Sequence, residues 1–401
     1  MGGFECSTHR LPSGRRLDLT NSTRHEELAA RDYRLLQAHG ILTARDGVRW
    51  HLIESSPGVY DFTSATSMFA AARETRMQVI WDLWHYGWPD DVDIFAPSFV
   101  DRFAAFARAT VQQLSEYDEA PLICPINEIS FFSWAGGEAG IFNPFARHRG
   151  DDLKRQLVRA FIAAVAAMRE VNPAVRSVQV DPIINVVPQS NSDDDVRNAE
   201  AYRLSQFNAS DMLLGRVEPE LGGDERVFDV IGLNYYIHNQ FVWHGAHIVP
   251  SDPRYRHVST MLQEVYERYR RPLFIAETGI EDMARPAWLR YICREVFTAI
   301  EAGVPVEGLC LYPVLNHPGW DDDRHCLNGM FDYADADGRR EVYRPLAEEV
   351  ARQQANLIAL REGHLNLAEM NDLDTTALDW AAHVMEELTD ESRPEAREEP
   401  A

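Results

Sequence analysis

The sequence predicts an α/β protein with a (β/α)8 TIM barrel, and three observations lead to this fold. Short runs rich in Val, Ile and Leu recur along the chain, segments with helical periodicity separate them, and the runs number eight. Near-continuous apolar strands that alternate with helices are typical of a parallel sheet covered by helices. Eight such units in a chain of 401 residues favour a sheet that closes into one barrel domain.

The predicted elements alternate regularly from one end of the barrel domain to the other. The eight apolar runs cover 2–7, 40–45, 77–83, 121–127, 175–183, 228–236, 271–277 and 306–314. Helical periodicity is clearest in five segments, several of which open with Pro, Ser or Asp as helices do. These segments are 24–39, 97–117, 151–171, 258–269 and 285–302. A doubly wound open sheet is the alternative, but no GxGxxG or GxxxxGK[ST] pattern follows the first run.

The domain boundary is expected after the eighth unit. We predict a catalytic barrel over 1–362 and an acidic C-terminal extension over 363–401. The extension holds one amphipathic segment, 374–388, that is expected to form a helix and to dock either on the barrel or on a partner. Its final part is rich in Glu and contains Pro, a composition that buries too little apolar surface to order itself, so we expect it to be disordered.

Composition narrows the partners and the location. A formal net charge of −24 opposes binding to nucleic acid or to anionic lipid, whose affinity rests on clustered Lys and Arg. The sequence has no apolar stretch near the roughly 20 residues that span a bilayer, and "MGGFECSTHR" lacks the pattern of a signal peptide. We therefore expect a cytoplasmic protein that binds a small neutral molecule, with its oligomeric state left open.

Metal and cofactor sites are not expected. The five cysteines are an odd number without a CxxC pair, which indicates reduced, mostly buried thiols. The acidic stretch "WDDDRH" (320–325) is interpreted as a solvated turn, because three adjacent aspartates in a tight loop do not point at one ion.

Polar side chains stand where the predicted strands end, and barrel enzymes hold their active sites at those ends. Glu128 follows Asn127 after the fourth strand, and Glu277 ends the seventh. A buried strand seldom ends on an ionisable carboxylate without a reason. The other strand ends carry Glu5, Arg45, His85, Asp181 or Asn185, Asn234 with Tyr236, and Asn316 with Trp320. A ring of polar groups with tryptophan is typical of a sugar site.

These residues resemble the site of a known family. Glu128 and Glu277 are similar to the acid/base and the nucleophile of the clan A (β/α)8 retaining glycoside hydrolases, and the chain is most like family 1, the β-glucosidase and β-galactosidase group. The likeness covers residues 1 to about 350. Its other motifs are "TARDGVRW" (43–50), "DLWHYGWP" (82–89), "IGLNYY" (231–236), and "LYPVLNHPGW" (311–320) with "GMFDYADADGRR" (329–340).

The resemblance implies an O-glycosyl hydrolase that cleaves the β-glycosidic bond of a small neutral glycoside or oligosaccharide by double displacement. Cleavage of an acetal needs one carboxylic acid to protonate the departing oxygen and one carboxylate to attack the anomeric carbon. Glu128 takes the first role and Glu277 the second. In retaining enzymes the two carboxyl groups lie about 5–5.5 Å apart, and the pKa of the acid is raised.

The remaining candidates are assigned to substrate binding or to the support of the two carboxylates. Arg45 and Tyr236 are expected to keep Glu277 ionised, because a cation and a hydroxyl donor favour a carboxylate. Asn127 is expected to donate its amide to the sugar 2-hydroxyl. The other predicted substrate-binding residues are His85, Trp84, Trp320, Asn234 and Glu5.

Three positions depart from the family pattern. Near the first strand the family carries a Gln that holds two sugar hydroxyls, and here "FECSTHR" offers Glu5 and His9. The Glu that the family places before the eighth-strand Trp is Gly319, and the first Trp of that motif is Tyr312. We therefore expect the reaction type to transfer better than the sugar, and the Gly319 side of the pocket to have room for modified sugars.

Two questions stay open on the sequence. "FFSWAGG" (131–137), just past Glu128, either lines an aglycone subsite or only caps the barrel. The alternative function is a weakly active or non-catalytic barrel that binds a carbohydrate or a partner, or a transglycosidase.

Overall fold

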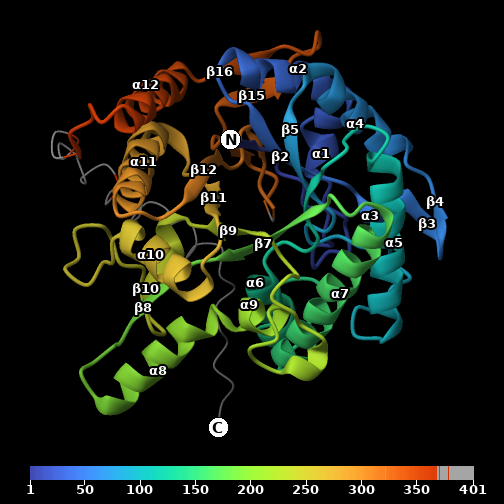
Figure 1. Cartoon of the computed structure of the whole chain (residues 1–401), viewed down its shortest axis with the longest axis horizontal. Helices are drawn as coiled ribbons and strands as arrows, with labels where there is room; N and C mark the ends of the chain where they lie inside the picture. Colours follow the sequence, from blue (N-terminus) through green and yellow to red (C-terminus); the bar gives the residue numbers. More distant parts are fainter. Residues whose placement is uncertain (321, 368–369, 371–377, 379–401) are drawn as a thin grey trace.

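The computed structural model describes residues 1–320, 322–367, 370 and 378. Eight parallel strands form a closed barrel, in which each strand pairs with its neighbours in chain order and the last pairs with the first. Helices surround the barrel (Figure 1). The barrel strands are β1 (Gly2–Gly3), β2 (Thr43–Gly47), β5 (Gln78–Asp82), β6 (Leu122–Cys124), β7 (Arg176–Pro182), β9 (Val230–Asn234), β11 (Leu273–Thr278) and β12 (Val306–Leu311). The predicted fold is confirmed, and each barrel strand lies within or overlaps a predicted run.

The five predicted helices are all present, within three residues at each end. They are α2 (His25–Ala38), α5 (Ser98–Leu114), α7 (Gly150–Val171), α10 (Val258–Tyr269) and α11 (Arg285–Glu301). The sequence did not single out three other helices of the described chain: α4 (Thr63–Thr75), α8 (Asp193–Ser205) and α12 (Arg344–Arg361). The short helices are α1 (Leu19–Ser22), α3 (Trp50–Ile53), α6 (Ile129–Phe132), α9 (Asn208–Leu213), and single turns at Pro219–Leu221, Ile237–Asn239 and Asp282–Ala284, with a π-helical turn at Ser133–Glu138.

The core has two layers that follow the period of two along the strands. On β11, Phe274 and Ala276 belong to the small cluster inside the barrel, whereas Leu273 and Ile275 belong to the large one. The large cluster fills the space between the sheet and the helices, where α5 contributes Phe103 and other rings at helical spacing. The inner cluster fills the interior of the barrel beneath the polar residues at the strand ends.

A small parallel sheet extends the barrel on one side. β8 (Asn185–Val187) pairs with β10 (Gln240–Val242), and α8 lies next to β8 (Figure 1). Ser192 caps α8 by accepting a hydrogen bond from the Asp195 N–H, and three aspartates fill its first turn, which suits the positive end of a helix. Three hairpins complete the described strands: β3 (Glu54–Ser56) with β4 (Val59–Tyr60), β13 (His317–Pro318) with β14 (His325–Cys326), and β15 (Phe331–Ala334) with β16 (Arg340–Val342).

The predicted helix at 374–388 lies outside the described residues, except for Leu378. The division into a barrel over 1–362 and an extension over 363–401 stays a prediction, and α12 ends at Arg361, next to that boundary. Among the described residues, no helix combines the length and the apolar character that a membrane span requires.

Candidate active site

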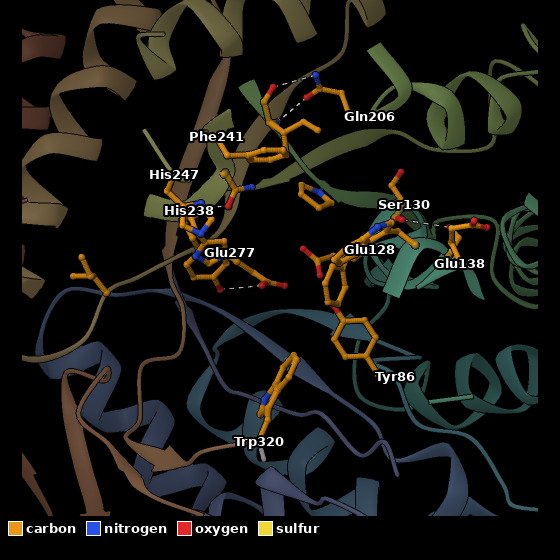
Figure 2. A pocket seen from close by; sticks show the side chains of 18 of the residues that line it. Tyr86, Glu128, Ser130, Glu138, Gln206, His238, Phe241, His247, Glu277 and Trp320 are labelled. Carbon is orange, nitrogen blue, oxygen red and sulfur yellow. Dashed lines mark hydrogen bonds between the residues drawn. The ribbon is translucent and has the colours of Figure 1, made fainter. Parts of the chain in front are cut away.

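The carboxyl ends of the barrel strands open into a pocket of about 1580 Å³. Figure 2 shows Glu128 and Glu277 on opposite walls of this pocket, pointing toward one another, with Trp320 below them. Six of the ten residues predicted from the sequence line it: Glu5, His85, Glu128, Tyr236, Glu277 and Trp320. Arg45, Asn127 and Asn234 lie behind this lining, are fully buried, and reach the two carboxylates directly or through one another.

Glu128 lies at the turn between β6 and α6, in a left-handed backbone conformation with φ 52°. Its side chain is 9% exposed. Asn234 Nδ2 donates to Oε1 at 2.8 Å, and the Tyr86 hydroxyl donates to Oε2. Burial first, and then the charge of Glu277, raise the pKa of Glu128 to about 8, which outweighs the opposite effect of the two donors. Glu128 is therefore protonated near neutral pH, as a general acid must be.

Glu277 lies on β11 opposite Glu128 and is 5% exposed. Arg45 Nη1 donates to Oε1 at 2.6 Å, and the Tyr236 hydroxyl donates to Oε2 at 3.0 Å. Each oxygen thus meets one donor, and one of the two donors is a guanidinium, which makes a strong, charge-assisted hydrogen bond. This is the environment that suits a carboxylate nucleophile.

Arg45 is the centre of the buried network. Its Nε and Nη2 bind the two oxygens of Asp82 at 3.1 and 2.8 Å, and Nη2 also donates to Asn127 Oδ1 at 2.7 Å. The residue is 0% exposed, so its charge is compensated by Asp82 and Glu277 rather than by water. Burial lowers the pKa of Arg45, but these two carboxylates together raise it well above its usual value. A guanidinium with five donors in a fixed plane can serve all three partners at once.

Glu5, after β1, and His85, after β5, lie near each other in the pocket lining. Asp82 Oδ2 lies 2.9 Å from His85 Nδ1, and His85 Nε2 lies 4.0 Å from Glu5 Oε1 and 3.3 Å from Asn127 Nδ2. Glu5 Oε1 accepts from the backbone N–H of Ser7 at 2.9 Å. His85 is thus oriented by Asp82, and its other ring nitrogen lies near Asn127 and Glu5.

Trp84 does not line the pocket, and this corrects the expectation that its ring faces a sugar. It is 1% exposed and packs edge-on against Phe132, with the rings 4.7 Å apart. Asn127 is fully buried and its amide nitrogen donates to the Tyr86 oxygen at 3.1 Å, so its donation to a sugar hydroxyl stays a prediction. Both side chains support the site from behind.

Asp181, Asn185 and Asn316, the remaining strand-end candidates, make structural contacts. Asp181 accepts from the backbone and the hydroxyl of Ser130, and burial raises its pKa to about 7. Asn185 donates to Gln240, which ties β8 to β10. Asn316 binds groups of the loop and hairpin that follow it.

The outer part of the pocket is aromatic. Phe131, Ser133 and Trp134 of the "FFSWAGG" segment line it, so this segment faces the pocket. Another wall of the pocket comes from α8, β10 and the residues that follow β10, and Figure 2 shows Phe241 of β10 among the lining residues. Its aromatic members are Tyr202, Phe241 and Trp243, with His238, His244 and His247 beside them. Sequence analysis did not identify this wall, since α8 was not predicted.

Gly319 lines the pocket, but a side chain at this position would meet the loop that follows. A Cβ atom at this position would lie 2.1 Å from Asp322 Oδ1 and 3.3 Å from the Arg324 side chain. Arg324 in turn makes a two-pronged ion pair with Glu281. Asp322 and Arg324 line the pocket beside Gly319, and room for modified sugars on this side stays a prediction.

Sequence reasoning missed Tyr86 and Asp82. Asp82 is the last residue of β5, and it orients both Arg45 and His85. A carboxylate that directly ends a predicted strand was a usable signal for it. Nothing in "LWHYGWP" distinguishes Tyr86 from the core aromatic residues beside it.

A metal site is not supported by the donors present. Among the described residues, Cys6, Asp82 and His85 bring three potential ligand atoms within 4.8 Å of one another. Asp82, however, is already bound on both oxygens by Arg45 and on one by His85. Burial raises the pKa of Cys6 to about 11, so it is a neutral thiol, whereas metals bind the thiolate.

The closed (β/α)8 barrel is a fold of the glycoside hydrolase type. Comparison with solved structures shows this similarity. The structure is similar to a β-glucosidase from Thermotoga maritima in complex with glucoimidazole, with 16% identity, a TM-score of 0.71, and 86% of this chain and 88% of that chain covered. It is also similar to a hyperthermophilic β-glucosidase mutant, with 15% identity, a TM-score of 0.71, and 87% and 98% covered.

A third similar structure is the AHE enzyme from Alicyclobacillus herbarius, with 16% identity, a TM-score of 0.69, and 83% and 87% covered. No family model matches the sequence, and no curated protein matches it. At these identities the similarity shows the fold: the chain has the (β/α)8 barrel of the family 1 β-glucosidases.

Proposed function

We propose that this protein is a retaining β-glycosidase in which Glu277 is the nucleophile and Glu128 is the general acid and base. One observation carries the proposal. Two buried carboxyl groups face each other across a pocket, and their environments differ. The pKa of Glu128 is raised to about 8, while Glu277 receives a guanidinium and a phenol hydroxyl. Double displacement needs this division of roles.

The geometry supports each step with a named group. Glu277 attacks the anomeric carbon while Glu128 gives its proton to the departing oxygen, so the glycosidic bond breaks and a glycosyl-enzyme ester forms. Glu128, now a carboxylate, accepts a proton from a water molecule that attacks the same carbon, and the bond to Glu277 breaks. Asn234 and Tyr86 bind Glu128 in both stages, and Arg45 holds the Glu277 oxygen that stays free.

The substrate is proposed to be a small glycoside with an apolar or aromatic aglycone. Trp320 lines the inner pocket, and the aromatic walls lie farther out. Aromatic faces bury the apolar face of a pyranose or a flat aglycone, whereas the polar groups near Glu5 and His85 suit sugar hydroxyls.

A panel of aryl β-glycosides tests the proposal. Purified protein is incubated with the glucoside, galactoside, mannoside, fucoside, xyloside and glucuronide, and release of the phenol is measured. We expect at least one to be hydrolysed. Glu277→Gly is expected to lose turnover almost wholly and to regain part of it with azide or formate, which fill the space left by the carboxylate. Hydrolysis of none of the six, or near-normal activity of the variant, would refute the proposal.

A second candidate, a barrel that binds carbohydrate without efficient turnover, is favoured by one observation. Asn127 has its amide committed within the protein rather than free for a sugar hydroxyl. The same panel separates the two functions: binding of a glycoside by calorimetry without release of the phenol would support the second.

A further inference from the structure

Tyr86 joins the two halves of the site through its hydroxyl group. The hydroxyl donates to Glu128 Oε2 and accepts from Asn127 Nδ2 at 3.1 Å. Asn127 in turn accepts from Arg45, which also binds Glu277. A continuous chain of hydrogen bonds therefore runs from one carboxylate to the other.

The direction of these hydrogen bonds is fixed by chemistry. Arg45 has donors only, so the atom of Asn127 that faces it must be the carbonyl oxygen. The amide nitrogen of Asn127 then faces Tyr86 and donates to the phenol oxygen. The phenol hydrogen is therefore donated to Glu128. Every hydrogen bond in this series is donated in the same direction, from Arg45 toward Glu128.

Packing holds the Tyr86 ring in place. The side chain is 1% exposed, stacks on Phe132 at 5.9 Å and 12°, and meets Phe142 edge-on at 5.3 Å. The backbone of Tyr86 has φ 68°, a left-handed conformation that is strained for a bulky residue. Glu128 has a left-handed backbone as well. Strain at both partners of one hydrogen bond is typical of a functional site rather than of simple core packing.

We propose that Tyr86 is a positioning residue for Glu128: it holds the Oε2 atom and stabilises the carboxylate that remains when the proton has left. The proposal rests on the role of Glu128 in the proposed function. When Glu128 gives its proton to the departing oxygen, the electron pair of its O–H bond stays on the carboxylate, and the Tyr86 hydroxyl binds that charge. In the second stage the same hydrogen bond keeps the carboxylate aimed while it takes a proton from water.

The charges around Glu128 set the direction of the expected effect. Glu277 on β11 and Asp181 on β7 raise its pKa, whereas the hydroxyl of Tyr86 and the amide of Asn234 on β9 lower it. Tyr236, which binds Glu277, is a further titratable group that interacts with Glu128. Removing the Tyr86 hydroxyl removes one of the hydrogen bonds that lower the pKa of Glu128. Burial, Glu277 and Asp181 still raise it, so the pKa of Glu128 should rise further.

The first test does not require turnover. Protein labelled with [13C]δ-glutamate is titrated by NMR as wild type and as Tyr86→Phe, and the Glu128 signal is assigned by its loss in Glu128→Gln. The titration midpoint of Glu128 is expected to rise in Tyr86→Phe. Tyr269→Phe is the matched control, because Tyr269 is a buried phenol that donates to Asp211, and neither residue lines the pocket. An unchanged midpoint in Tyr86→Phe would overturn the proposal.

The second test uses kinetics on any glycoside that the wild type hydrolyses. Tyr86→Phe is expected to slow substrates with poor leaving groups at least tenfold more than activated aryl ones, and to move the alkaline limb of kcat/KM to higher pH. If Tyr86→Phe slows both kinds of substrate equally and leaves the alkaline limb of kcat/KM at its wild-type pH, Tyr86 has a purely structural role and the proposal is overturned. A wild type without activity would refute the proposed function, and the NMR titration would still decide whether Tyr86 controls Glu128.

Discussion

Both burial and the facing carboxylate of Glu277 oppose the ionisation of Glu128. Activity that needs its proton is expected to fall as the pH rises through about 8, the pKa of the folded state. The alkaline limb of kcat/KM for a weakly activated glycoside measures this value. A limb below about pH 6 would contradict the assignment of Glu128 as the acid.

The same shift has a consequence for stability. The folded-state pKa of Glu128, about 8, lies above its usual value of 4.5, so the folded protein binds this proton more tightly than the unfolded chain. The resulting contribution to the free energy of unfolding is complete below pH 4.5 and is lost as the pH rises toward 8.

Glu128→Gln cannot titrate, and it tests this consequence. Its melting temperature is expected to exceed that of the wild type by a margin that grows between about pH 5 and pH 8, reaching a few degrees. Thermal unfolding followed by circular dichroism at several pH values measures the margin. A constant difference across this range would show that Glu128 titrates normally in the folded state.

The residues of the site differ in how well their positions could be predicted. Glu128 and Glu277 stand out because a charge that ends an apolar strand has few structural explanations. Tyr86 does not stand out, since its role depends on a left-handed backbone and on the orientation of Asn127, neither of which leaves a pattern in the sequence. Trp84 was predicted to bind substrate, and this was wrong. Its neighbour His85 lines the pocket, but the turn places the Trp84 ring in the core.

At the scale of elements, β1 brings its second glycine close to an aromatic ring beside the active site. It has only two residues, Gly2 and Gly3, between β2 and β12. A Cβ atom on Gly3 would lie 2.1 Å from Cδ2 of Tyr312, a buried ring that stacks on His85. The absence of a side chain at Gly3 therefore lets the Tyr312 ring pack beside the active site.

Gly3→Ala is expected to destabilise the protein by about 1–3 kcal/mol, the usual cost of overpacking a rigid core. Gly308→Ala on β12 is the matched comparison, because its Cβ would meet the flexible end of Met1 at 2.6 Å and the loss should be smaller. Urea unfolding measures both variants. If Gly3→Ala and Gly308→Ala have the same free energy of unfolding, the Tyr312 ring shifts as easily as the end of the Met1 side chain.

The elements themselves were predicted where their patterns are strong. α5 and α7 show clear apolar faces, whereas α8 lies at the side of the barrel and buries one residue, Ala199, of thirteen. Such a helix has little apolar periodicity to detect. Because α8 and β10 contribute to the outer pocket wall, this wall was the part of the site that the sequence revealed least.

For the whole molecule, closure of the barrel is what makes two distant sequence positions one site. Glu128 and Glu277 are separated by about 150 residues, yet β6 and β11 end at the same rim of the barrel. Counting eight units in the sequence was enough to predict this meeting. The distance and orientation of the two carboxyl groups, in contrast, depend on Arg45, Asn234 and Tyr86, which had to be seen in place.

The stereochemistry of hydrolysis tests the central assignment most directly. If Glu277 forms a covalent glycosyl-enzyme and Glu128 then activates water, two inversions occur and configuration is retained. Proton NMR of the sugar first formed from a β-glycoside, recorded before mutarotation, should show the β-anomer. Appearance of the α-anomer first would mean a single displacement by water, and it would contradict the roles of both carboxylates.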